Sequence, residues 1–269
     1  FNHINHCNDK RQCNQISLNA VNIRMLKEKL QTFGENVSTI NIDNLKNGFD
    51  FVFVIGGDGT ILKTARFYAK YQTPIFGVNL GRLGFLSQSS VEMLDDSVNR
   101  IINKDYIVEN RVMLQTSNYL ALNDIVIKGS ATGRTSRFSL KINDNPVCDY
   151  LADGIIVATP TGSTAYGLSA GGPVLSPSLN AFVIVPICPH TMTARPLVVP
   201  DSEKITVCTA EQNKKYVISA DGQEFCEACS NIEIVKSTYS AKLALLKESG
   251  FYSVLRDKLH WGESPAFCN

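Results

Sequence analysis

The residues most able to do chemistry lie in one short stretch of glycines around a carboxylate. Residues 56–60 read Gly-Gly-Asp-Gly-Thr and directly follow the apolar run 51–55. Glycine has no Cβ, so these positions permit a positive φ and let a phosphate approach the backbone. Thr60 is placed to cap a following helix, whose first N–H groups favour an anion. The stretch therefore predicts a phosphate-binding turn.

Asp58 is the unusual residue of this turn, because a carboxylate beside a phosphate is repelled unless something compensates. A proton-transfer role or a bound metal would compensate, so Asp58 is a candidate general base or metal partner. The alternative is that Asp58 only caps the helix or fixes the turn. The stretch matches neither common phosphate-loop fingerprint, since it has no Gly-Lys-Ser/Thr and no GxGxxG.

A second candidate stretch, residues 153–173, is a short apolar run that opens into a segment dense in Gly, Ser and Thr. Small hydroxyl residues offer donors and acceptors at close range, and Tyr166 can stack on a planar ring such as adenine. The alternative is a flexible linker. We favour a functional loop, because Thr-Pro and a tyrosine are poor linker composition and long loops in compact domains are usually functional.

Other polar residues carry weaker signals on their own. Asn123 and Asp124 open a predicted strand, which alone is typical of an ordinary turn. His190 and Asp221 fall in predicted turns, where such residues are usually structural or solvated. Arg82 lies between two glycines after a predicted strand and could meet a phosphate, but a structural or solvated arginine is the favoured interpretation.

Composition excludes several classes of protein. The chain has 269 residues and a net charge of +1, so no basic field argues for nucleic acid or an anionic membrane. No apolar run approaches the roughly 20 residues of a membrane span, and the first residues lack the features of a signal peptide. The eight cysteines are spread along the chain, and Cys226 and Cys229 form a CxxC with no second pair. We expect reduced thiols, no protein metal site and a cytoplasmic protein.

The first part of the chain predicts alternating helices and strands. Helical spacing covers 18–33 and 93–102, a short strand is expected over 37–42, and a strand buried on both faces over 51–55 precedes a helix over 61–71. The run 74–78 is expected to be a parallel neighbour of 51–55. Residues 1–17 show no convincing first strand.

The character of the chain changes after residue 106. Many short β-like runs with turn residues between them extend to about residue 247, and helical spacing returns over 251–259. We expect an α/β, Rossmann-like N-terminal domain (1–106) followed by an all-β-rich C-terminal domain (107–249). The C-terminal helix, 250–269, is expected to return to the first domain.

Taken together, the motifs resemble those of the NAD kinase family in content and order. They are the glycine turn 56–60, Leu-Asn-Asp at 122–124, the run 159–173, the segment 189–197 and Asp-Gly-Gln at 221–223. The resemblance covers residues 50–261. The run Thr-Pro-Thr-Gly-Ser-Thr-Ala-Tyr is the discriminating motif, because lipid kinases and phosphofructokinases carry similar glycine turns.

The resemblance implies transfer of the γ-phosphoryl group of ATP, or of polyphosphate, to the 2′-hydroxyl of the adenosine ribose of NAD, which gives NADP. It implies a need for Mg²⁺ or another divalent cation, and a homodimer or homotetramer. Asp58 would take the hydroxyl proton, and Asp153 would meet the nicotinamide end, often across a subunit boundary. The phosphates would be lined by Gly56, Gly57, Gly59 and Thr60, and NAD would be contacted by Asn123, Asp124, Asp153, Thr161, Thr164, Ala165, Tyr166 and Ser169.

Two other functions remain open at this point. One is a lipid or sugar kinase with the same glycine turn, although the lipid kinases' Leu-Gly-Thr-Gly-Asn-Asp type of run is absent. The other is a nucleotide-binding sensor with weak or lost catalysis. Retention of Asp58 argues against a sensor, which could dispense with a carboxylate that repels phosphate.

Overall fold

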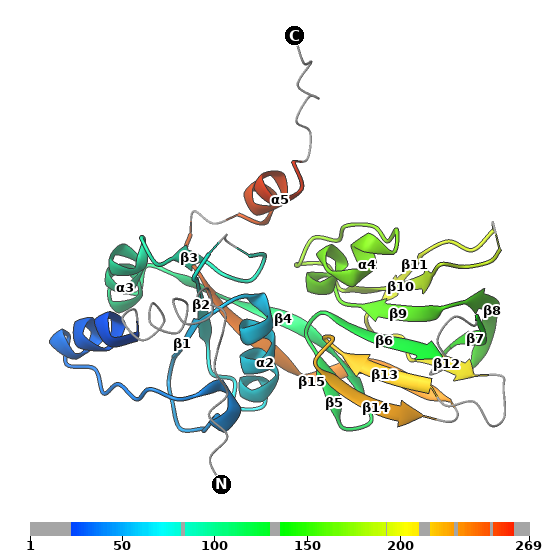
Figure 1. The fold of residues 1–269 in the computed structure, drawn as a ribbon, viewed down its shortest axis with the longest axis horizontal. Helices are drawn as coiled ribbons and strands as arrows, with labels where there is room; N and C mark the ends of the chain where they lie inside the picture. The colour runs from blue at the N-terminus through cyan, green and yellow to red at the C-terminus, as the bar shows by residue number, and fades with distance from the viewer. Residues whose placement is uncertain are drawn as a thin grey trace, which may run out of the picture. The chain divides into compact units, whose positions relative to one another are not determined.

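The computed structural model describes residues 23–81, 84–129, 135–191, 193–209, 216–228, 231–247 and 250–260. The weak first strand, the start of the helix expected over 18–33, Arg82 and Cys229 fall outside these ranges. The chain divides into two compact units (Figure 1). Unit 1 takes its residues from 1–64, 75–108 and 244–269, and unit 2 from 65–74 and 109–243. Each unit is described by itself.

Unit 1 is built on short parallel strands. β1 (Val52–Ile55) pairs parallel with β2 (Ile75–Asn79), and β2 pairs parallel with β3 (Ser89–Ser90). Every residue of β2 is buried, as expected for a parallel strand covered on both faces. The remaining elements are a helix over 23–32, η1 (Ile42–Asn44), the first part of α2 (Asp58–Ala69), α3 (Leu94–Ile102) and α5 (Phe251–Leu259). The rest of α2, from residue 65 and including Arg66, belongs to unit 2.

The core of unit 1 joins β2 to its helices. Phe76 and Val78 lie in one buried cluster with Leu26 and Leu30 of the helix over 23–32 and with Val98 of α3. The predicted parallel pair of strands is confirmed. The strand predicted over 37–42 is wrong, because those residues are exposed or half-buried and lead irregularly into η1.

Unit 2 contains one complete sheet and part of a nine-stranded sheet, both built there largely of antiparallel pairs. One has six strands in the order β11-β10-β9-β6-β13-β14. These strands are β6 (Asp124–Gly129), β9 (Gly154–Ala158), β10 (Ala181–Ile187), β11 (Leu197–Pro200), β13 (Tyr216–Ala220) and β14 (Glu224–Ala228). The other sheet includes β4 (Ile107–Thr116), β5 (Tyr119–Ala121), β7 (Ser136–Ile142), β8 (Asn145–Ala152), β12 (Ile205–Thr209) and β15 (Ile232–Leu245). The expectation of a β-rich second part is confirmed.

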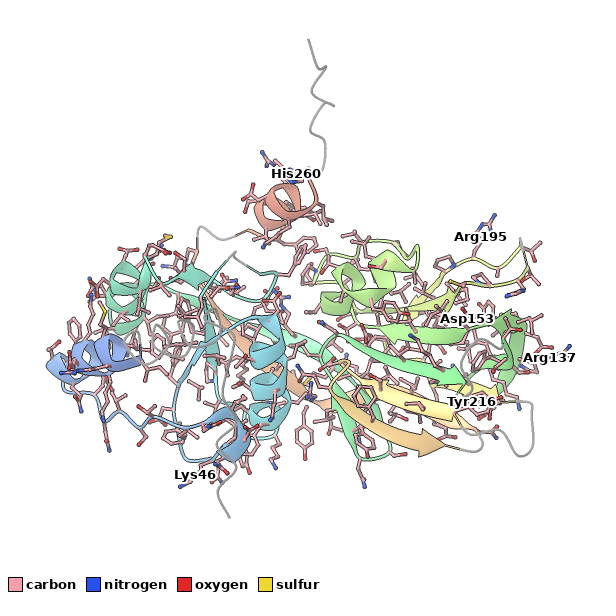
Figure 2. All side chains as sticks on the ribbon, viewed as in Figure 1. Lys46, Arg137, Asp153, Arg195, Tyr216 and His260 are labelled. Atoms are coloured by element: carbon pink, nitrogen blue, oxygen red, sulfur yellow. The ribbon has the colours of Figure 1, made fainter. Side chains whose placement is uncertain are left out.

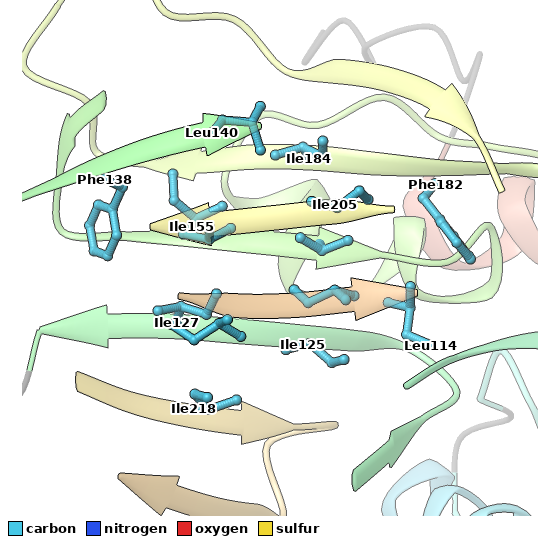
Figure 3. Close-up of a cluster of buried hydrophobic side chains, with 14 of the residues drawn as sticks. Leu114, Ile125, Ile127, Phe138, Leu140, Ile155, Phe182, Ile184, Ile205 and Ile218 are labelled. Carbon is cyan, nitrogen blue, oxygen red and sulfur yellow. The ribbon is translucent and has the colours of Figure 1, made fainter. Parts of the chain in front are cut away.

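The main core of unit 2 is filled from both sheets (Figure 3). Alternate residues of β6 and β10, such as Ile125 and Ile184, meet Leu140 and Ile205 of the other sheet. The intervening residues of the six-stranded sheet face the opposite side, as the period of two requires. There they form a second buried cluster, which includes Val126, Ile156, Val183, Val185 and Leu175.

The central strands of the six-stranded sheet are therefore apolar on both faces. The segment that follows β9 contains η2 (Thr161–Thr164) and α4 (Tyr166–Ser169), and Leu175 from this segment joins the second cluster. Figure 1 shows α4 beside β9 and β10. This apolar layer positions the Gly, Ser and Thr segment beside the end of β9. No helix within the described ranges is long and apolar enough to cross a membrane.

Candidate functional site

In unit 1, the glycine turn joins β1 directly to α2. The N–H of Gly56 donates to the carbonyl of Val78 at 2.9 Å, so pairing with β2 continues past the end of β1. A Cβ at Gly56 would lie 2.7 Å from Thr60 Oγ1, whereas a Cβ at Gly57 would meet nothing within 4 Å. Gly56 is thus required by close packing, and Gly57 and Gly59 are exposed beside the first turn of α2.

The structure corrects one detail of this turn, the expected helix cap. Gly56, Gly57 and Gly59 permit a positive φ but do not adopt it, since the glycines with positive φ in the described residues are at 34, 48, 171 and 222. Thr60 is not a cap, because α2 begins at Asp58 and Thr60 is already inside the helix. The carbonyl of Thr60 accepts from Thr64 Oγ1 at 2.8 Å. The helix starts three residues earlier than the sequence pattern suggests, at residue 58 rather than 61.

Asp58 contacts a second glycine loop, the segment between β2 and β3. One carboxylate oxygen accepts from the N–H of Phe85 at 2.9 Å and the other from the N–H of Leu86 at 3.4 Å. A Cβ at Gly84 would lie only 1.9 Å from Asp58 Oδ1. Gly84 is in turn held by its N–H, which donates to Ser87 Oγ at 2.7 Å. The Asp58 carboxylate therefore holds the loop between β2 and β3. This role differs from capping α2 and from fixing the turn 56–60, the two structural roles considered from the sequence.

In unit 2, the second set of predicted residues gathers at one edge of the six-stranded sheet. β6 runs antiparallel to both of its neighbours, with Asp124 opposite Ala158 of β9 and Ile125 opposite Ala220 of β13. The start of β6 therefore lies beside the ends of β9 and β13. This topology brings Asn123 and Asp124 next to the segment that begins at Thr159 and next to Asp221.

The backbone of Asn123 is held closely by the segment after β9. The N–H of Thr159 donates to the carbonyl of Asn123 at 2.9 Å, and Thr159 Oγ1 donates to the carbonyl of Leu122 at 2.6 Å. A Cβ at Gly162 would lie 2.0 Å from the carbonyl oxygen of Asn123. Position 162 thus accepts only glycine without a backbone shift.

Asp221 approaches the same turn from β13. Its carboxylate accepts from the backbone N–H of Leu122, Asn123 and Asp124 at 3.1, 2.7 and 3.2 Å. It also accepts from Arg66 Nη1 at 2.8 Å. The side chain of Asp221 is completely buried. Asp221 is therefore neither solvated nor an ordinary turn residue, in contrast to the interpretation from sequence.

Asp124 is the predicted NAD-contacting residue whose acidity is most altered. Burial is the larger cause and the nearby charge of Asp221 the smaller, and together they raise the pKa of Asp124 from 3.8 to about 7. Its carboxyl group is therefore poised between the protonated and the ionised form near neutral pH. In the protonated form it can donate a hydrogen bond as well as accept one.

The Gly, Ser and Thr segment is ordered as two short helical turns, so the linker interpretation is wrong. Thr161 is buried, and its Oγ1 accepts from Arg111 Nη1 at 3.3 Å. Ser163 Oγ accepts from the N–H of Leu175 at 2.9 Å and so closes the segment. Thr164 and Ala165 are half-buried, and Ser169 is exposed.

Tyr166 presents its ring at the surface of this segment. Its side chain is an exposed aromatic, and Lys128 Nζ donates to the hydroxyl at 2.9 Å. The same ammonium group lies 4.8 Å from the ring centroid, which is a cation–π contact. The ring of Tyr166 is thus oriented by β6 before any ligand binds.

Asp153 is not brought to this edge of the sheet. It is exposed and lies between β8 and β9, whereas Thr161 follows the other end of β9. β9 has five residues, so the two lie roughly 15 Å apart along the strand direction. Figure 2 labels Asp153 at the end of unit 2 away from α4.

Sequence reasoning missed the basic residues Arg66, Arg111 and Lys128. Arg66 carried a usable signal, because it is a charged residue on a helix whose positions 61, 62, 65, 68 and 69 are apolar and buried. A buried guanidinium needs an acidic partner. In the described residues, no group of three or more His, Cys, Asp and Glu side chains is placed to hold a metal.

Comparisons with known proteins agree on one family. The family models of the ATP-NAD kinase N-terminal and C-terminal domains match residues 5–106 and 122–246. A NAD kinase from Caldanaerobacter subterraneus subsp. tengcongensis is 45% identical over 221 residues, 78% of each chain. A NAD kinase from Carboxydothermus hydrogenoformans is 40% identical over 248 residues, 87% of this chain and 89% of the relative.

Two solved structures are similar over most of the chain. An NAD kinase from Archaeoglobus fulgidus in complex with ATP has a TM-score of 0.77 and 31% identity, covering 88% of this chain and 94% of that one. Yeast NADH kinase complexed with NADH has a TM-score of 0.75 and 28% identity, covering 83% and 69%.

Proposed function

The chain belongs to the NAD kinase family, and from this premise we propose the roles of its residues in the phosphorylation of NAD. The enzyme transfers the γ-phosphoryl group of ATP to the 2′-hydroxyl of the adenosine ribose of NAD, which gives NADP. Polyphosphate is a second possible donor. The related structures that hold ATP and NADH support these substrates.

Asp58 is the general base that takes the proton of the 2′-hydroxyl. The observation that carries this role is its position at the first residue of α2, held by the N–H groups of Phe85 and Leu86. Phosphoryl transfer requires positioning and charge stabilisation more than covalent chemistry, so a fixed carboxylate is a suitable base. The phosphates lie against the N-terminus of α2, where they meet Gly56, Gly57, Gly59 and Thr60.

NAD is held by the edge of the six-stranded sheet in unit 2. Asn123 and Asp124 contact its polar groups, and Tyr166 stacks on the adenine ring. The grouping of these residues at one sheet edge and the fixed ring of Tyr166 support the assignment. The other contacts come from Thr161, Thr164, Ala165 and Ser169.

Asp153 contacts the nicotinamide end of NAD that is bound by a neighbouring subunit of a homodimer or homotetramer. Its exposure and its place at the opposite end of β9 from Thr161 support this role. We also propose domain limits at 1–106 and 107–249, with the C-terminal segment 250–269 belonging to the first domain, and a cytoplasmic location.

A divalent cation such as Mg²⁺ would accompany ATP and supply positive charge at its phosphates. Mg²⁺ in kinases is commonly held by substrate phosphates and only one or two carboxylates. When bound, the ion neutralises charge on the phosphates. The protein's own part is to place Asp58 and the first turn of α2 against the reacting groups.

The test is an assay of NADP formation with NAD, Mg²⁺ and either ATP or polyphosphate. Asp58→Asn should lower kcat by at least about 100-fold, the usual contribution of a general base, and leave the Kd for NAD within about twofold. The matched control is Asp43→Asn, which removes an exposed carboxylate paired with Lys63. An Asp58→Asn enzyme with nearly unchanged kcat would refute the base, and NAD binding without NADP formation by the wild type would indicate a sensor.

A further inference from the structure

The Asn123–Asp124 turn is also held by two residues outside the proposed NAD contacts, Asp221 and Arg66. The Asp221 carboxylate receives three backbone N–H groups of this turn and one guanidinium nitrogen of Arg66. The exposed fraction of the side chain is 0% for Asp221 and 6% for Arg66. Both charges are thus removed from water and satisfied by each other and by the turn.

The backbone on both sides is shaped to make these contacts. Asp221 has a φ of 52° and Gly222 a φ of 65°, so two consecutive residues take the left-handed conformation. The N–H of Asp221 donates to the carbonyl of Asp124 at 2.9 Å, while the N–H of Asp124 donates back to the Asp221 carboxylate. Arg66 Nη2 also donates to Gln223 Oε1 at 2.8 Å. The two turns are therefore locked to each other in both directions.

The charge of Asp221 matters as well as its shape. A carboxylate only accepts hydrogen bonds, so it can receive several N–H groups at once. An asparagine in its place would present an NH₂ group to donors of the turn or to Arg66. Arg66 compensates the buried negative charge, which would otherwise be costly.

Because the backbone groups of this turn are hydrogen-bonded within the protein, the side chains of Asn123 and Asp124 are left to contact the ligand. The carbonyls of Leu122 and Asn123 accept from Thr159, and the N–H groups of the turn donate to Asp221. We infer that Asp221 and Arg66 form a positioning pair that holds Asn123 and Asp124 in the geometry that binds NAD. Because the pair affects NAD binding only through Asn123 and Asp124, this inference rests on the proposed function.

The test is Asp221→Asn in the full-length enzyme, with NAD affinity measured by calorimetry and KM and kcat by NADP formation. The expected result is a rise of at least tenfold in the Kd and KM for NAD, with the KM for ATP changed by less than twofold. Arg66→Lys, which keeps the charge and one donor, should lose less NAD affinity than Arg66→Gln. A role in folding alone would not separate the two substrates in this way.

The matched control is Asp201→Asn. Asp201 is also a buried carboxylate of unit 2, and it accepts from Lys236 Nζ at 2.5 Å. This variant should lose stability but keep its affinity for NAD. Equal NAD affinities in Asp221→Asn and Asp201→Asn, or equal losses for ATP and NAD, would overturn the positioning role.

Two further variants keep the test decisive. If Asp221→Asn does not fold, the comparison of Arg66→Lys with Arg66→Gln replaces it, and equal NAD affinities in those two variants overturn the inference. Asn123→Ala separates the inference from the proposed function on which it rests. Unchanged NAD affinity in Asn123→Ala refutes the contact itself, whereas a loss there without a loss in Asp221→Asn refutes only the positioning pair.

Discussion

Asp124 is the residue whose protonation the fold most clearly controls. Its side chain is buried beside the Asp221 carboxylate, and Arg66 contacts Asp221. The pKa of about 7 means that the folded protein binds a proton at Asp124 over a range in which the unfolded chain, with a pKa of 3.8, does not. By linkage, this group stabilises the fold fully below about pH 4 and loses that contribution as pH rises through about 7.

Asp124→Asn tests this linkage, because the amide stays neutral at every pH. We expect the free energy of unfolding of the wild type to decrease from pH 4.5 to pH 7.5 relative to that of the variant. Urea unfolding at several pH values measures both curves, and their difference isolates Asp124 from the other titrating groups. Parallel curves across this range would show that the carboxyl group titrates normally.

At the residue scale, the sequence identified residues whose role follows from their neighbours in the chain. Asp58 was recognisable because a carboxylate among glycines after a buried strand is an odd choice for a turn. Asp221 was not, because its significance lies in Arg66, which is 155 residues away in the chain. A single sequence gives no sign that those two residues meet, although Asp221 lies in one of the family motifs and Arg66 lies on a helix with apolar, buried neighbours.

At the element scale, the two glycine loops of unit 1 form one arrangement. The loop after β1 supplies Asp58, and the loop after β2 receives its carboxylate at Phe85 and Leu86. Gly84 permits this contact, because any side chain there would overlap the carboxylate. The position of Asp58 is therefore set by an element other than its own helix.

Gly84→Ala should displace the Asp58 carboxylate and lower kcat by about 10- to 100-fold, since small misplacements of a reacting group carry costs of this size. NAD affinity should change little. Gly81→Ala is the matched control, because a Cβ there meets only Asn79 Oδ1 at 3.9 Å. Steady-state NADP formation measures both variants. Equal kcat values in the two would show that Gly84 does not determine the position of Asp58.

Element boundaries were harder to predict than element types. The apolar runs over 51–55 and 74–78 predicted β1 and β2, because a strand buried on both faces must be apolar throughout. The run over 37–42 is only half apolar, and the structure forms no strand there within the described residues. The start of α2 was misplaced because Gly and Asp are typical of turns and here form the first helical turn.

At the scale of the whole molecule, the order of strands decides which motifs meet. Short apolar runs predicted a β-rich second part, but they do not encode the order β11-β10-β9-β6-β13-β14. That order places β6 between β9 and β13, and so unites three motifs that are far apart in the sequence. The residues of the NAD edge were therefore predictable as candidates, and their assembly was not.

The stability of this edge depends on the core beneath it. Phe182 of β10 is completely buried in the cluster shared by the two sheets of unit 2. Phe182→Ala should lower the free energy of unfolding by about 3–5 kcal/mol, the range for a buried Phe. Phe225→Ala, at a position 62% exposed on β14, should change it by less than about 0.5 kcal/mol. Urea unfolding measures both variants.

The same variant separates the core from the NAD edge. Because Phe182 packs in the core and forms no part of the NAD contacts, the folded fraction of Phe182→Ala should bind NAD with nearly normal affinity. A specific loss of NAD binding with normal stability would contradict this division between core and edge.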